Sequence, residues 1–147
     1  MHAHLQSKLR LPPDELFAGG ACHVYARALR RHFPDMQLRR AGDPDSSTET
    51  PKGMHVYCSS RGLLVDASQI TQEENYLQRC NYTAWDCTEE ELFTAWHKSE
   101  RGPLNRWRHN LDQDFISRAD SIAEDHIAVR MQQIRQSLQD VEQHQKA

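Results

Sequence analysis

Apolar residues between positions 21 and 33 recur every three or four residues, and this spacing predicts an amphipathic helix. Its inward positions are Cys22, Tyr25, Ala26, Leu29 and Phe33. Arg27, Arg30 and Arg31 fall mainly on the opposite side, where we expect a solvated face rather than an anion site. The Pro34-Asp35 pair ends the helix, because proline lacks the amide hydrogen that a helix interior needs.

The pattern then changes to the alternation of β-strands. Residues 36–40 predict an edge strand, and residues 54–58 and 63–67 predict two strands joined by the turn 59–62. With the turn centred between Ser60 and Arg61, antiparallel pairing places His55 directly opposite Asp66. One face of this hairpin is then wholly apolar, with Met54, Val56, Cys58, Leu63, Val65 and Ala67. The other face carries the imidazole and the carboxylate.

The flanking segments are predicted from breakers and helix caps. We expect residues 1–10 to be loosely ordered and residues 41–53, which are rich in polar and turn-forming residues, to form a surface loop that borders the site or acts as a lid. Thr71 with Glu74, and Thr88 with Glu91, have the spacing of capping boxes. They predict two further helices, the second of which continues through Leu92, Phe93 and Trp96.

A narrow apolar stripe on a long polar helix is predicted for the C-terminal segment, which has no glycine or proline from residue 111 onward. The stripe consists of Ile116, Ala119, Ala123, Ile127, Met131, Ile134, Leu138 and Val141. Such a stripe must be buried, and the sequence leaves two possibilities open. The helix covers the sheet of its own domain, or it binds a second copy of the chain or another protein.

Cys22, His55 and Asp66 are the residues with the clearest catalytic chemistry. Cys22 follows two glycines at the predicted start of a helix, where partial positive charge and free N–H groups favour a thiolate. An adjacent imidazole can take the thiol proton and return it to a leaving group, and a carboxylate on the far ring nitrogen fixes its tautomer. Each residue also has an ordinary explanation when taken alone: a core cysteine, a strand histidine and a turn aspartate.

Four neighbouring residues are candidates for contacts with the substrate or the oxyanion: Gly20, Ala21, His23 and Tyr57. The glycine would let a substrate approach the backbone closely, and the backbone N–H of Cys22 is a natural oxyanion donor. His23 is alternatively a packing or solvent-facing residue, and Tyr57 is alternatively a packed aromatic. A second oxyanion donor is missing, since Gln6 is the only upstream glutamine and lies far from Cys22 in the chain.

The segments Gly20-Ala21-Cys22, His55-Val56-Tyr57 and Leu64-Val65-Asp66-Ala67 together resemble the papain-like superfamily, in the order used by transglutaminase-like proteins. The resemblance covers about residues 14–70. It implies a thiol acyl-transfer mechanism. The superfamily includes peptidases, deamidases, amide-crosslinking enzymes and acetyltransferases. The residue after the nucleophile departs from the family pattern, since a histidine stands where an aromatic or small residue is usual.

Composition restricts the other functional classes. The net charge is −3, and the basic clusters are short and balanced by acidic residues, so the sequence does not indicate a nucleic-acid-binding protein. No apolar run has the length of a membrane span or a signal peptide. The four cysteines and nine histidines show no zinc-type spacing, so we predict no metal and no cofactor. We expect a cytoplasmic protein with reduced cysteines, although a translocated effector without a cleaved signal would have the same composition.

These observations predict an α+β protein with a small antiparallel sheet of roughly three strands packed on the Cys22 helix, as in a papain-like or transglutaminase-like core. Residues 1–110 would form one thiol-hydrolase-like domain, and residues 111–147 the long C-terminal helix, packed on the domain or a partner. The expected activity is attack of Cys22 on an amide or isopeptide bond of a protein or peptide-like substrate. Transglutaminase or deamidase chemistry, or a non-enzymatic interaction protein that uses the C-terminal helix, are the alternatives.

Overall fold

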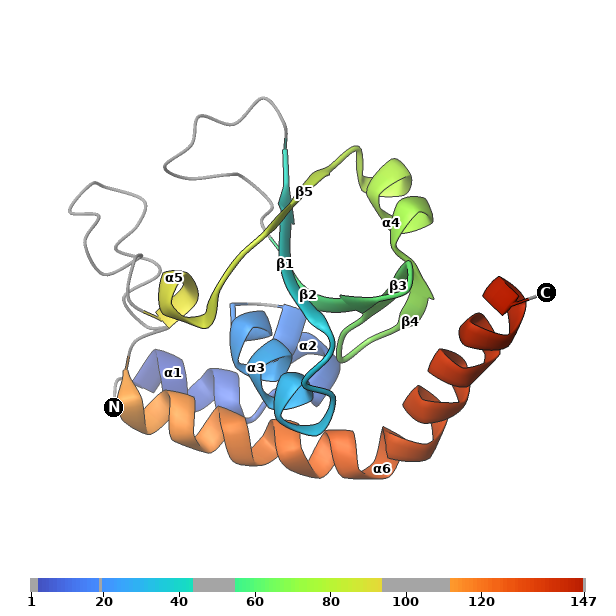
Figure 1. The fold of residues 1–147 in the computed structure, drawn as a ribbon. Helices are drawn as coiled ribbons and strands as arrows, with labels where there is room; N and C mark the ends of the chain where they lie inside the picture. The colour runs from blue at the N-terminus through green and yellow to red at the C-terminus, as the bar shows by residue number, and fades with distance from the viewer. Residues whose placement is uncertain (1–2, 19, 44–54, 94–111, 147) are drawn as a thin grey trace.

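An antiparallel β-sheet with helices on both faces forms the centre of the α+β fold (Figure 1). The structure is a computed structural model that describes residues 3–18, 20–43, 55–93 and 112–146. Within these residues, five strands are arranged in the order β4-β3-β2-β1-β5, which is more than the roughly three predicted. The strands are β1 (Gln37–Gly42), β2 (His55–Ser60), β3 (Leu63–Val65), β4 (Ile70–Gln72) and β5 (Thr83–Asp86).

The helices divide the hydrophobic residues into two clusters. They are α1 (Ala3–Leu9), α2 (Pro13–Ala18), α3 (Cys22–His32), α4 (Glu73–Cys80), α5 (Glu89–Phe93) and α6 (Gln113–Lys146). The larger cluster lies between the sheet and α3, and α1, α2 and α6 add further apolar residues to it. The smaller cluster lies on the opposite face of the sheet, where Tyr76 of α4 packs on Tyr57 and Leu64.

The hairpin of β2 and β3 has the predicted faces but a different register. Cys58 pairs with Val65 and Ser60 with Leu63, so the predicted pairing of His55 with Asp66 is wrong by two residues. Arg61 and Gly62 both have positive φ angles, 52° and 82°, which is the conformation of a tight two-residue hairpin turn. A slip of two residues leaves every side chain on its predicted face, whereas a slip of one would have exchanged the faces. Met54 lies outside the described residues.

The predicted apolar face of the hairpin is confirmed for four of its six residues. Val56, Cys58, Val65 and Ala67 belong to the cluster under α3. The opposite face carries His55, but it is not an open polar face, because Tyr57 and Leu64 are fully buried there.

Three other local predictions are wrong. Strand β1 is an interior strand rather than an edge, since β2 and β5 pair with its two sides. Thr71 lies in β4 and does not cap a helix; α4 begins after Gln72, without a side-chain cap. The N-terminal segment forms the helix α1 rather than loose chain, because Leu5 is buried in the core.

Two predicted helices begin where the sequence indicates. Helix α3 is confirmed over nearly its whole predicted range. Thr88 caps α5, since its Oγ1 accepts a hydrogen bond of 3.1 Å from the backbone N–H of Glu91. The predicted continuation to Trp96, and most of the predicted loop at residues 41–53, lie outside the described residues.

Helix α6 uses its apolar stripe within the chain. Ile116, Ala119, Ala123, Ile127 and Ile134 are at most 4% exposed and belong to the larger core cluster. Of the possibilities that the sequence leaves open, α6 packs on its own domain, but against the layer of α1, α2 and α3 rather than on the sheet, and its C-terminal part bends toward β3 and β4 (Figure 1). Neither α6 nor any other helix in the described part of the chain is long and apolar enough to cross a membrane.

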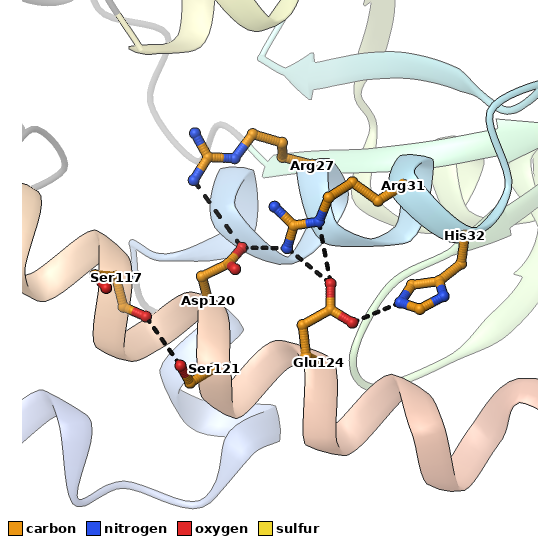
Figure 2. A network of polar contacts seen from close by, with 7 residues as sticks. All are labelled: Arg27, Arg31, His32, Ser117, Asp120, Ser121 and Glu124. Atoms are coloured by element: carbon orange, nitrogen blue, oxygen red, sulfur yellow. Dashed lines mark hydrogen bonds and ion pairs between the residues drawn. The ribbon is translucent and has the colours of Figure 1, made fainter.

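Polar side chains hold α6 to α3 beside this stripe. Figure 2 shows Arg31 between Asp120 and Glu124 of α6, with N–O distances of 2.5 and 2.8 Å, and His32 on the other oxygen of Glu124. Arg27 approaches Asp120 at 4.0 Å. The arginine side of α3 is therefore only partly the solvated face predicted from the sequence: the side chains of Arg27 and Arg31 are 26% and 44% exposed, and an acidic face of α6 lies against them.

We predict that Ile127→Ala lowers the free energy of unfolding by about 2–5 kcal/mol, because it removes methyl and methylene groups from a fully buried position on α6. Val129→Ala on the same helix is the matched control, since Val129 is 88% exposed. Urea unfolding followed by circular dichroism measures both. Equal unfolding midpoints for the two variants would mean that α6 is not packed on the domain in solution.

Candidate active site

Cys22 is the first residue of α3, as predicted. Gly20 precedes it with a φ angle of 117°, a conformation that side chains disfavour, and lets the chain turn into the helix. The N-cap residue Ala21 makes no side-chain hydrogen bond to the helix. The backbone N–H groups at this helix start therefore have no side-chain cap and remain suited to an anion near the sulfur. Gly19 lies outside the described residues.

His55 and Asp66 are brought together at one end of the β2–β3 hairpin. His55 is the first residue of β2 and Asp66 directly follows β3, and the imidazole Nε2 lies 2.7 Å from the Asp66 Oδ2. In the observed register the two residues are diagonal rather than opposite, a separation that a long side chain still spans. The predicted contact is therefore present although its predicted register is wrong.

Both carboxylate oxygens of Asp66 accept hydrogen bonds. Oδ1 accepts the backbone N–H groups of Ser68 and Gln69, each at 2.9 Å, and Oδ2 accepts His55 and the Gln69 side-chain amide. Burial raises the pKa of Asp66, but the hydrogen bond and charge of His55 and the two turn residues outweigh it, so the pKa is lowered. The carboxylate is thus fixed in its ionised form and in one orientation.

The Cys22 thiol interacts with two imidazoles, those of His55 and His23. Since Nε2 of His55 points at Asp66, Nδ1 is the ring nitrogen left for the thiol. Burial raises the pKa of Cys22, but hydrogen bonds with His23 and His55 and the charges of these rings lower it to about 5. Burial lowers the pKa of His55, whereas its hydrogen bonds with Asp66 and Cys22 raise it to about 10. Both shifts favour a thiolate beside an imidazolium at neutral pH.

The other cysteines lack this environment. Cys58 and Cys87 are buried, and burial raises the pKa of each to about 12. Cys80 is exposed, and all four cysteines are free thiols. Cys22 is therefore the cysteine whose surroundings favour a nucleophile.

His23 and Tyr57 lie at the site but are not open to solvent. His23 is completely buried beside Cys22, with its ring centroid 5.0 Å from that of Phe93, so it packs rather than faces solvent. Tyr57 is also completely buried; its hydroxyl donates a 2.6 Å hydrogen bond to Glu73, and its ring stacks on His55 at 5.9 Å. His23 therefore contacts the thiol, and Tyr57 contacts the imidazole of His55.

A hollow of about 360 Å³ opens beside His55 and Asp66. Its other lining residues are aromatic or uncharged: Phe17, Ala18, Ala67, Ser68, Gln69, Tyr76 and Tyr82. Cys22 does not line the hollow itself, but Phe17, Asp66 and Ala67 line both the hollow and the tight space around Cys22. The volume is at the lower end of the roughly 300–1,000 Å³ typical of ligand pockets.

Two residues that the sequence did not indicate lie at the site. Gln69 and Arg130 both form hydrogen bonds with Asp66. The position of Gln69, three residues after an aspartate, is a recognisable turn signal, whereas nothing in the sequence links Arg130 to a residue 64 positions away. Gln6, the upstream glutamine, is exposed on α1, whereas Cys22 is 7% exposed. Within that part of the chain, no group of three or more His, Cys, Asp or Glu side chains is arranged to hold a metal ion.

Comparison of the chain with the models of known protein families, with curated proteins and with solved structures gave no match in any of the three.

Proposed function

We propose that this chain is a cysteine-dependent acyl-transfer enzyme, and specifically a thiol hydrolase that cleaves an amide or isopeptide bond. The observation that carries the proposal is the arrangement of Cys22 at a helix start, next to an imidazole whose far nitrogen lies 2.7 Å from a buried carboxylate. A helix start, a base and an orienting carboxylate are the three elements that activate a thiol nucleophile.

The proposed reaction has two steps. The Cys22 thiolate attacks the carbonyl carbon, and the imidazolium of His55 gives its proton to the leaving amine as the carbon–nitrogen bond breaks, which leaves an acyl-enzyme. His55, now neutral, takes a proton from water; the hydroxide attacks the acyl-enzyme, and the thiol ester breaks to release the acid and the thiolate. Asp66 keeps the imidazole in one tautomer and stabilises its charge in both steps.

Backbone N–H groups at the start of α3 are the proposed oxyanion donors. The Cys22 N–H lies at the helix start, where the helix supplies no carbonyl partner and Ala21 supplies no cap. Gly20 and Ala21 shape the approach to this amide, and Ala21 is itself 1% exposed. The role of these two residues is therefore to place backbone rather than to contribute side-chain chemistry.

The resemblance to the papain-like superfamily supports this proposal through the order of the three residues and their elements. A cysteine opens a helix, a histidine begins β2, and an aspartate directly follows the neighbouring antiparallel strand β3. Among the described residues, the hollow beside His55 is lined by no charged side chain besides the His55–Asp66 pair, so we propose an uncharged segment of a protein or peptide-like substrate there.

Transfer to an amine and deamidation of glutamine use the same three residues, and they differ from hydrolysis only in the acceptor or in the leaving group. A non-enzymatic interaction protein is the rival from a different class. It would have no need for an ionised thiol, so the reactivity of Cys22 separates the two classes.

We predict that iodoacetamide modifies Cys22 faster than the other cysteines at pH 6–7. Because the pKa of Cys22 is lowered to about 5, its rate should rise through about pH 5 and then level off. His55→Ala removes one of the two imidazoles that lower this pKa, so the labelling midpoint should rise by at least about one pH unit, and the rate at pH values below both midpoints should fall by about tenfold, since one pKa unit is there a tenfold change in thiolate. Mass spectrometry of the modified peptides gives each rate.

The exposed Cys80 is the accessible reference thiol in this experiment, and Cys58 and Cys87 are the buried references. Slow labelling of Cys22 at a rate equal to theirs, and unaffected by His55→Ala, would contradict the proposed enzyme and favour the interaction protein.

We predict that Asp66→Asn slows hydrolysis of a trapped acyl-enzyme by roughly 10²–10⁴-fold, the usual contribution of a positioned acid–base pair. Both Asp66 oxygens accept hydrogen bonds, so an amide must turn its NH₂ group toward one set of donors. The measurement is the decay of the acyl adduct, formed with an activated ester, in the intact mass of the protein. Asp35→Asn, at an exposed position, is the control and should decay at the wild-type rate.

A further inference from the structure

Arg130 of α6 makes two hydrogen bonds with a single nitrogen atom. Its Nη1 donates to the hydroxyl oxygen of Tyr25 and to the backbone carbonyl of Asp66, both at 2.7 Å. A guanidinium NH₂ group carries two hydrogens, so one nitrogen satisfies both acceptors at once. The contact is partly buried, where a charged donor gives a stronger hydrogen bond than it would in water.

Tyr25 continues this chain of hydrogen bonds to His126, one turn earlier on α6. The Tyr25 hydroxyl lies 2.7 Å from Nδ1 of His126. Burial raises the pKa of Tyr25 to about 12, so the hydroxyl keeps its hydrogen. Because its oxygen already accepts from Arg130, that hydrogen is directed to Nδ1, which accepts it. Burial and the charge of Arg130 lower the pKa of His126, in agreement with a neutral imidazole.

These bonds join the two elements that carry the catalytic groups. Tyr25 follows Cys22 by three residues and lies one turn further along α3. The carbonyl of Asp66 belongs to the residue whose carboxylate holds His55. One guanidinium thus bridges the helix that bears the thiol and the turn that bears the carboxylate, and adds a polar link to the apolar packing of Ala67 under α3.

The apolar docking of α6 fixes the position of this guanidinium. Ile127 and Ile134 are fully buried, and both lie within four residues of Arg130 on the same helix. The ring of Tyr25 is held from the other side by Phe17 of α2, at 4.9 Å between centroids. Both ends of the contact are therefore anchored in the core, which leaves the geometry of the bridge little freedom.

We propose that Arg130 is a positioning residue for the reaction of Cys22, so that the C-terminal helix is part of the catalytic arrangement. This inference rests on the proposed function. Arg130 touches no reacting atom; it acts by keeping Asp66, and through Asp66 the ring of His55, at the distance from α3 that the thiol requires. Small displacements of positioned groups cost up to about 10²-fold in rate.

The test compares Arg130→Gln with Arg135→Gln, which removes the same charge from an exposed position of the same helix. The readout is the pH midpoint of iodoacetamide labelling at Cys22 in the full chain, measured where circular dichroism shows the protein folded. We expect the midpoint to rise by about one pH unit in Arg130→Gln, with a labelling rate about tenfold lower at pH values below both midpoints. Arg135→Gln should keep the wild-type midpoint.

Two further variants keep the test decisive if Arg130→Gln does not fold. Arg130→Lys retains a charged donor, and Tyr25→Phe removes the hydroxyl while leaving the bond to Asp66. A raised midpoint in Tyr25→Phe, and a smaller rise in Arg130→Lys than in Arg130→Gln where the latter folds, support the inference. A wild-type midpoint in every folded variant at positions 25 and 130 overturns it.

The wild-type protein separates the two proposals. If wild-type Cys22 has no labelling midpoint near pH 5, the proposed function fails and the role of Arg130 fails with it. If the wild-type midpoint is low and these variants leave it in place, the inference alone is overturned, and the proposed enzyme stands.

Discussion

The hydrogen bond between Asp66 and His55 is the interaction on which the rest of the candidate site depends. A buried carboxylate is stable only where hydrogen-bond donors surround it. The turn after β3 supplies two of them, the backbone N–H groups of Ser68 and Gln69. The same turn would hold an aspartate without any histidine nearby. The imidazole then finds a fixed anion on one side, and its other nitrogen is directed away from the turn toward the start of α3.

The ionised forms of Cys22 and His55 depend on their neighbours. Burial opposes both; the imidazoles of His23 and His55 offset it for the thiolate, and Asp66 and Cys22 offset it for the imidazolium. A site of this kind needs accurate distances more than it needs exposure, because a small increase in the distance between the sulfur and the imidazole favours return of the proton to the sulfur. This requirement explains why rigid, packed neighbours such as His23 and Tyr57 surround the reacting groups, and why a mobile loop could not replace them.

Local signals in the sequence indicated the candidate residues Cys22, His55 and Asp66 and most of the elements that carry them. The helix at Cys22 follows from its apolar spacing, and the faces of the hairpin follow from alternation, which survives an error of two residues in register. That error came from the turn, because nothing local required Arg61 to take a positive φ angle. Strands β4 and β5 were missed because they have only three and four residues and are held by pairing with β3 and β1 rather than by a pattern of their own.

Contacts distant in sequence were beyond prediction, and α6 shows why. Its apolar stripe requires burial, but periodicity does not say which surface buries it. The arginines of α3 are predicted to be solvated because their acidic partners on α6 are distant in the sequence. The hydrogen bond from Arg130 to the Asp66 carbonyl could not be predicted for the same reason. Once α6 is docked, the helix cannot be a passive cover: the side chain that satisfies the Asp66 carbonyl and the Tyr25 hydroxyl comes from it. Any force that displaces α6 must therefore also loosen the turn that orients His55.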